Sequence, residues 1–90
     1  MAKIKVEKLS EETLENRKVR SWPIWEKEKS KFRWHYDRTE MCYILEGEAR
    51  VAPEGGEGVT FGAGDFVTFP KGMDCVWEIT KDIRKHYNFK

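Results

Sequence analysis

Residues 62–75 read GAGDFVTFPKGMDC, and this stretch decides the fold. A short apolar segment, DFVTF, lies between two turn signals, GAG and PKG, as a short strand does. Glycine tolerates the positive φ that strand ends often need, and proline fixes the backbone for a tight turn. The pattern predicts a strand and then a turn that directs Cys75 toward the interior of a β structure.

The same sequence pattern extends from Trp22 to the end of the chain. Short apolar segments alternate with turn residues, most clearly at PEGG, which occupies residues 53–56. Many short strands with regular turns are typical of an antiparallel sandwich or barrel. We expect strands at residues 24–28, 31–36, 41–46, 49–52, 58–61, 65–69, 75–79 and 83–88.

The N-terminal part of the chain has a different pattern. Residues 3–9 (KIKVEKL) alternate charged and apolar side chains, which predicts a half-buried strand. Ser10, followed by two glutamates, is typical of a helix start, because its hydroxyl caps free N–H groups and acids suit the positive end of the helix. We therefore expect a short surface helix to about Arg17 or Lys18. The chain divides into an extension, residues 1–21, and a barrel, residues 22–90.

Composition limits the partners of this chain. Its 90 residues suit a single domain, and its net charge is +1 although 37% of the residues are charged. That balance provides no electrostatic basis for binding nucleic acid or an anionic membrane. The sequence contains no apolar run of membrane-spanning length and starts without an apolar signal segment. These features predict a cytoplasmic protein whose Cys42 and Cys75 are reduced thiols.

Two spaced motifs resemble those of the cupin superfamily. The second is Gly64, five residues, Pro-x-Gly at residues 70–72, and then Cys75; the first retains Glu40, six residues and Gly47. The chain resembles a cupin from about residue 22 onward. The phrases CYILEG, GDFVTFPKG and RKHYNF are similar to small single-domain cupins grouped with ureidoglycine aminohydrolase-like proteins. The resemblance implies an all-β antiparallel cupin barrel (jelly-roll) and, for the family's enzymes, a metal that holds the substrate.

The first motif can be aligned in two registers. The two histidine positions of cupins fall on either Arg33 and His35 or Trp34 and Tyr36. Side chains alternate along a strand, so the two registers place opposite faces inside. Burying Phe32, Trp34 and Tyr36 gains about 2 kcal/mol per ring, whereas burying the charged face requires pairing. We therefore predict Trp34 and Tyr36 inside the barrel and His35 outside.

This register leaves a poor set of metal ligands. The usual positions hold Trp34, Tyr36, Glu40 and Cys75, which supply one carboxylate and one thiol but no imidazole. Divalent metals usually take three or four nitrogen, oxygen or sulfur ligands. We predict no metal site and no cofactor, with a divalent metal as the alternative.

The expected pocket is walled by aromatic side chains. Glu40, inside a barrel, needs a partner, and Lys85 of the last strand is the predicted cation. Glu40, as a general acid or base, and Cys75, as a nucleophile, are the candidate catalytic residues. The cysteines could equally be core residues. The predicted ligand-binding residues are Trp34, Tyr36, Cys42, Trp77, Lys85 and Tyr87.

Three functions fit these residues. The first is a cupin that binds a small organic molecule in this pocket. The second is a metal-dependent enzyme, a hydrolase or isomerase, resembling ureidoglycine aminohydrolase. The third is a structural domain without a ligand. We also expect a homodimer, in which the N-terminal strand joins the partner's sheet.

Overall fold

Two long antiparallel strands form the centre of the molecule. Strand β4 (Glu40–Pro53) has 14 residues and β7 (Asp74–Phe89) has 16. They pair along their whole length, from Glu40 opposite Phe89 to Pro53 opposite Cys75. Every other strand except β1 pairs with one half of β4 or of β7, so these two strands position the whole sheet.

The computed structural model describes residues 3–90; Met1 and Ala2, the first residues of the expected N-terminal extension, lie outside the described residues. The remaining elements, in chain order, are β1 (Lys5–Glu7), α1 (Glu11–Asn16), the 3₁₀ turn η1 (Val19–Ser21), β2 (Ile24–Lys27), β3 (Ser30–His35), β5 (Val59–Gly62) and β6 (Phe66–Phe69).

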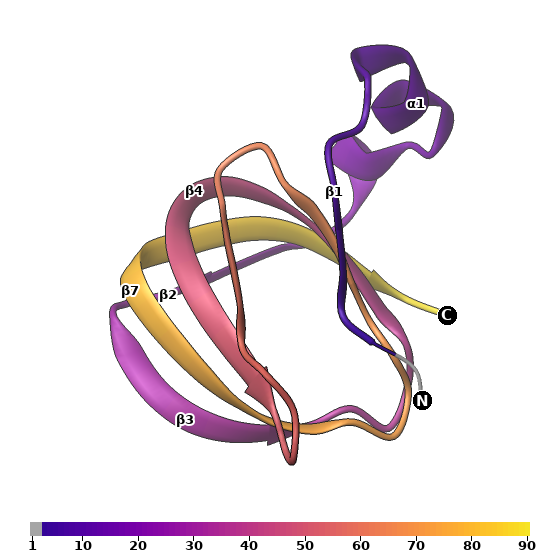
Figure 1. Ribbon diagram of the computed structural model, residues 1–90. Helices are drawn as coiled ribbons and strands as arrows, with labels where there is room; N and C mark the ends of the chain where they lie inside the picture. The colour runs from indigo at the N-terminus through magenta and orange to yellow at the C-terminus, as the bar shows by residue number, and fades with distance from the viewer. Residues whose placement is uncertain (1–2) are drawn as a thin grey trace.

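The sheet has two halves that share β4 and β7. One half has the strand order β1-β6-β4-β7-β2. In the other half β5 pairs with the second part of β4, and β3 pairs with the first part of β7. The two halves curl toward each other into an open barrel, as Figure 1 shows, and the ladder is not closed among the described strands. The predicted all-β antiparallel barrel of the jelly-roll type is confirmed.

A sharp bend at Gly47 joins the two halves. The sequence predicted separate strands at residues 41–46 and 49–52, and again at 75–79 and 83–88, but each pair forms one continuous strand. The pairing of β4 with β7 shifts register on both sides of Gly47, as in β-bulges, and Gly47 has a φ of 92°. A bulge bends a strand without ending it, so a glycine that suggests a turn in the sequence marks a bend here.

The N-terminal segment packs on the outer face of the sheet. Ser10 caps α1 by accepting a hydrogen bond from the backbone N–H of Thr13 at 3.2 Å. Leu14 of α1 and Val19 of η1 are buried with Phe66 of β6, so the helix and the 3₁₀ turn pack against the start of this strand. The helix ends at Asn16, one residue before the earlier of its two predicted ends.

Strand β1 pairs with β6 of its own chain, with Val6 opposite Val67. This pairing uses one edge of β1, and β1 lies at the end of the strand order, so the hypothesis that the N-terminal strand joins a partner's sheet in a homodimer stays a prediction.

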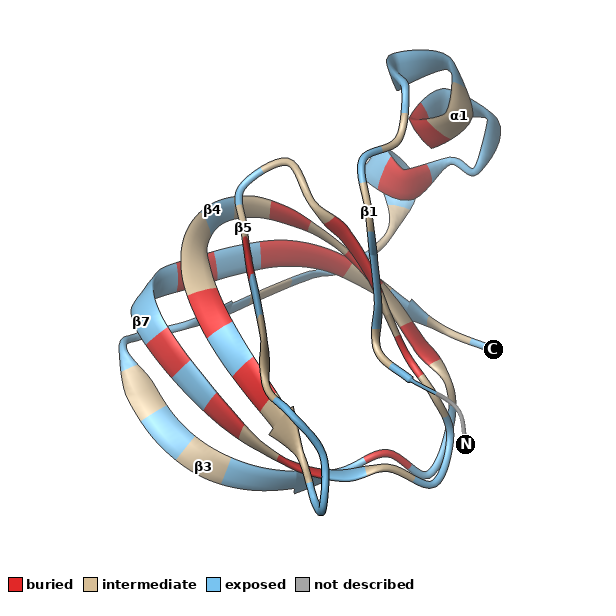
Figure 2. Ribbon diagram, in the orientation of Figure 1, coloured by how far each residue is buried: buried red, intermediate tan, exposed pale blue. Residues whose placement is uncertain are grey.

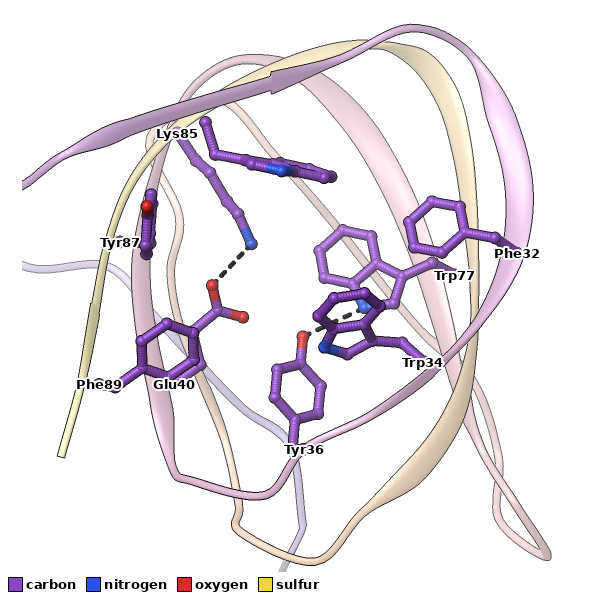
Figure 3. A pocket seen from close by; sticks show the side chains of 9 residues that line it. Phe32, Trp34, Tyr36, Glu40, Trp77, Lys85, Tyr87 and Phe89 are labelled. Carbon is purple, nitrogen blue, oxygen red and sulfur yellow. Dashed lines mark hydrogen bonds and ion pairs between the residues drawn. The ribbon is translucent and has the colours of Figure 1, made fainter.

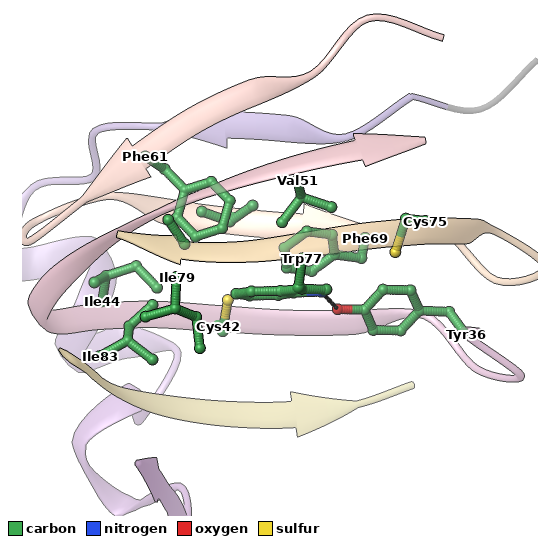
Figure 4. Close-up of a cluster of buried hydrophobic side chains, with 12 residues drawn as sticks. Tyr36, Cys42, Ile44, Val51, Phe61, Phe69, Cys75, Trp77, Ile79 and Ile83 are labelled. Carbon is green, nitrogen blue, oxygen red and sulfur yellow. Dashed lines mark hydrogen bonds between the residues drawn. The ribbon is translucent and has the colours of Figure 1, made fainter. Parts of the chain in front are cut away.

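The main core fills the space between the two halves of the sheet. Burial alternates along β4 and β7, as red and lighter bands show in Figure 2. Each fully buried valine, isoleucine or phenylalanine side chain stabilises the fold by about 1.5–3 kcal/mol relative to exposure. Figure 4 shows most of this cluster, which consists of Tyr36, Cys42, Ile44, Ala49, Val51, Phe61, Val67, Phe69, Cys75, Trp77, Ile79 and Ile83.

In the part of the chain that the structure describes, no helix is both long and apolar enough to cross a membrane.

Replacing Gly47 with alanine tests the bend. A Cβ at this position would overlap the backbone carbonyl of Asp82, and the positive φ adds strain. We expect Gly47→Ala to lower the free energy of unfolding by roughly 3 kcal/mol, measured by urea denaturation. Gly55→Ala is the matched control, because Gly55 also has a positive φ of 74° but nothing lies within 4 Å of its Cβ position. Equal losses in the two variants would contradict this role for the bend.

Candidate functional site

A pocket of about 240 Å³ opens between the edge strands β2 and β3 and the ends of β4 and β7. Seven of its nine lining side chains are aromatic, and the other two are a carboxylate and an amine. Figure 3 shows these side chains around the pocket, with the Lys85 ammonium next to the Glu40 carboxylate. The lining residues are Trp25, Phe32, Trp34, Tyr36, Glu40, Trp77, Lys85, Tyr87 and Phe89.

Strand alternation places the aromatic wall. Phe32, Trp34 and Tyr36 follow one another at every second position and all line the pocket. His35, on the opposite face, is exposed, and its Nδ1 lies 2.8 Å from the carboxylate of Asp74. The predicted orientation is therefore confirmed: Trp34 and Tyr36 face the pocket, and His35 faces outward.

Trp34 differs from the sequence prediction in its burial. Its side chain lines the pocket, yet the residue is 51% exposed. Strand β3 pairs with β7, and none of the strands among residues 3–90 pairs with its other side, so the end of this edge is open. Trp34 thus lies at the mouth of the pocket, whereas Tyr36 is fully inside.

The turn of the second motif holds Tyr36 in place. The Gly72 N–H donates to the carbonyl of Tyr36 at 2.6 Å, and the Tyr36 N–H donates to the carbonyl of Met73 at 2.9 Å. Gly72 has a φ of 87°, a conformation that favours glycine. The Pro-x-Gly turn and the aromatic wall are therefore joined through the backbone.

Glu40 and Lys85 form a buried ion pair at the inner end of the pocket. The Lys85 Nζ donates to Glu40 Oε2 at 2.9 Å. The Lys85 side chain is only 5% exposed and the Glu40 side chain only 6%. The same Nζ lies 4.9 Å from the centre of the Trp25 ring and 4.8 Å from that of Trp77, within the range of cation–π attraction. The ion pair predicted from the sequence is confirmed.

The hydroxyl of Tyr36 stays protonated next to this pair. It accepts a hydrogen bond from the Trp77 indole N–H at 3.1 Å. Burial raises the pKa of Tyr36 well above its usual range, and the nearby carboxylate of Glu40 raises it further. Tyr36 therefore presents a neutral phenol to the pocket.

The two cysteines lie in the core and not among the side chains that line the pocket. Burial raises the pKa of Cys75 to about 11 and the pKa of Cys42 to about 12. The Cys75 thiol lies 3.6 Å from the carbonyl oxygen of Trp34, to which it donates. A protonated, buried thiol is a poor nucleophile, so this environment does not favour thiol catalysis.

Three lining residues were missing from the set predicted from the sequence. Phe32 and Phe89 continue the alternation of Trp34 and Tyr87, so extending each pattern by one step would have found them. Trp25 enters the pocket because β2 pairs with β7, where Trp25 lies opposite Lys85. The sequence contains no local signal for that pairing.

The residues do not fit a cupin metal centre. Among residues 3–90 no group of three or more His, Cys, Asp or Glu side chains could hold a metal ion. Of the positions that hold ligands in metal cupins, Trp34 offers no lone pair for a metal, and Glu40 is bound by Lys85.

Removing one member of the ion pair should cost far more than removing both. We expect Lys85→Met to lower the free energy of unfolding by about 3–5 kcal/mol, because it leaves the Glu40 carboxylate buried without a partner. Adding Glu40→Leu should restore most of the loss. Chemical denaturation of the two single variants and the double variant measures the coupling, and additive losses would contradict it.

The cysteine environment predicts low thiol reactivity. A pKa of about 11 for Cys75 lies above the ordinary value of 9.0, so at pH 7 the thiolate is about a hundredfold scarcer than in the unfolded chain. Because the pKa is raised, reactivity should rise with pH toward pH 11. The measurement is labelling by a thiol-reactive disulfide reagent in buffer and in urea. Labelling of the native protein as fast as in urea would refute the burial of both thiols.

Comparison with known proteins places the chain in a family. A family model described as an EutQ-like cupin domain matches residues 14–87. No protein with a curated description matches the chain.

Solved structures agree with this match. A DUF861 family protein from Thermotoga maritima is 49% identical, with a TM-score of 0.96, over 98% of this chain and 100% of that chain. A candidate ethanolamine utilization protein Q (EutQ) from Salmonella typhimurium is 29% identical, with a TM-score of 0.67, over 73% of this chain and 53% of that one. The Clostridium difficile EutQ protein, at 21% identity and a TM-score of 0.67 over 73% of this chain and 52% of that one, shares the fold. This chain belongs to the EutQ-like cupin domain family.

Proposed function

We propose that the protein binds a small organic molecule in the aromatic pocket. The observation that carries the proposal is a cavity of about 240 Å³ in which seven aromatic side chains surround one buried ion pair. Ligand sites are typically concave and apolar, with a few polar groups that orient the ligand. The volume is below the roughly 300–1,000 Å³ of sites for drug-sized molecules, so the ligand is small.

The exposure of Trp34 supports binding over a purely structural role. A large aromatic side chain at the mouth of a cavity leaves apolar surface in water, which a ligand would cover. A barrel filled by its own side chains would leave no such space. The alternative of a structural domain without a ligand therefore has less support.

Binding also has more support than catalysis. Glu40 is held by Lys85 at 2.9 Å, and the pKa of Cys75 is raised to about 11, so neither group is activated as a base or nucleophile. A metal-dependent reaction like that of ureidoglycine aminohydrolase would need metal ligands where Trp34 and Tyr36 lie. That alternative is the weaker candidate for this chain.

A fragment screen tests the proposal. We expect some fragments with fewer than about a dozen heavy atoms to bind the wild-type protein in ligand-observed NMR. Their affinity should fall about tenfold in Trp34→Ala, because an aromatic anchor of a site is typically worth more than 1 kcal/mol.

Ile24→Ala is the matched control for this experiment. Ile24 is 45% exposed on the edge strand β2 and does not line the pocket, so its variant should bind fragments like the wild-type protein. A screen in which no binding depends on Trp34 would refute the proposed function.

A further inference from the structure

The charges that face the pocket cancel. Glu40 and Lys85 are the only two acidic or basic side chains among the nine that line it. They form one ion pair, so their charges sum to zero. Tyr36 adds no charge, because its phenol is held protonated. The pocket is therefore polar at one end but neutral as a whole.

This neutrality works against an ionic ligand. An anion would have to attract the Lys85 ammonium away from Glu40, and a cation would have to attract the carboxylate away from Lys85. At present the Lys85 ammonium and the Glu40 carboxylate are 2.9 Å apart. Either exchange would leave one of these two buried charges without its partner, which is costly. The ligand would also lose its own hydration in a pocket of aromatic walls.

An uncharged polar group can use both members of the pair without separating them. Lys85 donates to Glu40 Oε2, and in Figure 3 the other carboxylate oxygen of Glu40 points toward the side of the pocket where the Tyr36 hydroxyl lies. That oxygen can accept a hydrogen bond from a ligand N–H. An ammonium group has three N–H donors, so Lys85 retains donors for a ligand carbonyl.

The aromatic walls define the rest of the ligand. Phe32 stacks on Trp77 with an angle of 6° between the rings, and the Trp34 ring is at 88° to Phe32. Flat ring faces and edges of this kind pack well against a planar apolar group. Among the lining side chains, the polar contacts cluster at the end of the pocket formed by Glu40, Lys85 and Tyr36.

We propose, on the basis of the proposed function, that the ligand is a small, uncharged molecule that combines a planar apolar body with one amide-like group. The body lies between the aromatic walls and Trp34. The amide N–H donates to the carboxylate of Glu40, and its carbonyl accepts from the ammonium of Lys85. The ion pair acts as a recognition element for a neutral donor–acceptor group.

Three probes of the same size and shape test this inference: benzamide, benzoate and benzamidine, which are neutral, anionic and cationic at pH 7. We expect benzamide to bind wild-type protein at least about tenfold more tightly than either ion, measured by calorimetry and ligand-observed NMR. Equal or tighter binding of benzoate or benzamidine overturns the inference, and so does failure of all three to bind. Neither outcome affects the proposed function, which is judged by the Trp34-dependent fragments.

Two variants separate recognition from a structural role of the ion pair. Glu40→Gln leaves the Lys85 cation without a counter-charge, so the preference should change to benzoate. Lys85→Met leaves the Glu40 carboxylate, so the preference should change to benzamidine. A purely structural pair would weaken all three probes alike, which contradicts the inference. Ile24→Ala should keep the order of probe affinities found for the wild-type protein. If either pocket variant fails to fold, the comparison of the three probes on the wild-type protein decides whether the inference holds.

Discussion

The pairing of β4 with β7 across the bend at Gly47 is the constraint on which the rest of the structure depends. Each strand serves both halves of the sheet, so the bend determines how the halves face each other. A glycine is needed there because the carbonyl of Asp82 occupies the space of a Cβ and the backbone has a positive φ. The barrel is thus formed by curving one long ladder and not by packing two separate sheets.

The same ladder creates the pocket. Glu40 begins β4, and Lys85 lies in the half of β7 beside it, so the curved pair of strands places an acid and a base at the inner end of one cavity. Edge strands β2 and β3 then add Trp25, Phe32 and Trp34 from the side. Removing an ion pair from water is expensive, and here the cost is offset by a short charged hydrogen bond and by aromatic faces around the ammonium.

Strand alternation in the sequence predicted which side chains of the candidate site face inward. Alternation placed Phe32, Trp34 and Tyr36 on the inner face and His35 on the outer face, and the need to neutralise Glu40 pointed to Lys85. Alternation predicts which face of the strand a side chain is on, but not whether that side chain lies in the packed core or at the pocket. Cys42 shares the face of Glu40, yet it lies in the packed core.

Other features required contacts between distant parts of the chain. Gly47 has the same local appearance whether it ends a strand or bends one, and the difference depends on the Asp82 carbonyl across the ladder. Trp25 reaches the pocket because β2 pairs with β7 about sixty residues later in the sequence. The N-terminal strand found its partner in β6, a pairing that no pattern within residues 3–9 specifies.

The sequence by itself therefore determined the class of fold, the inward face of the aromatic strand and the chemical need for a cation beside Glu40. These follow from local periodicity and from the cost of burying charge, both of which can be evaluated residue by residue. Only the tertiary structure decided which aromatic side chains line the cavity, which cysteines are withdrawn from it, and how far Trp34 is exposed. Those properties depend on strand pairing and on depth within the barrel, which are set by contacts between residues far apart in the chain.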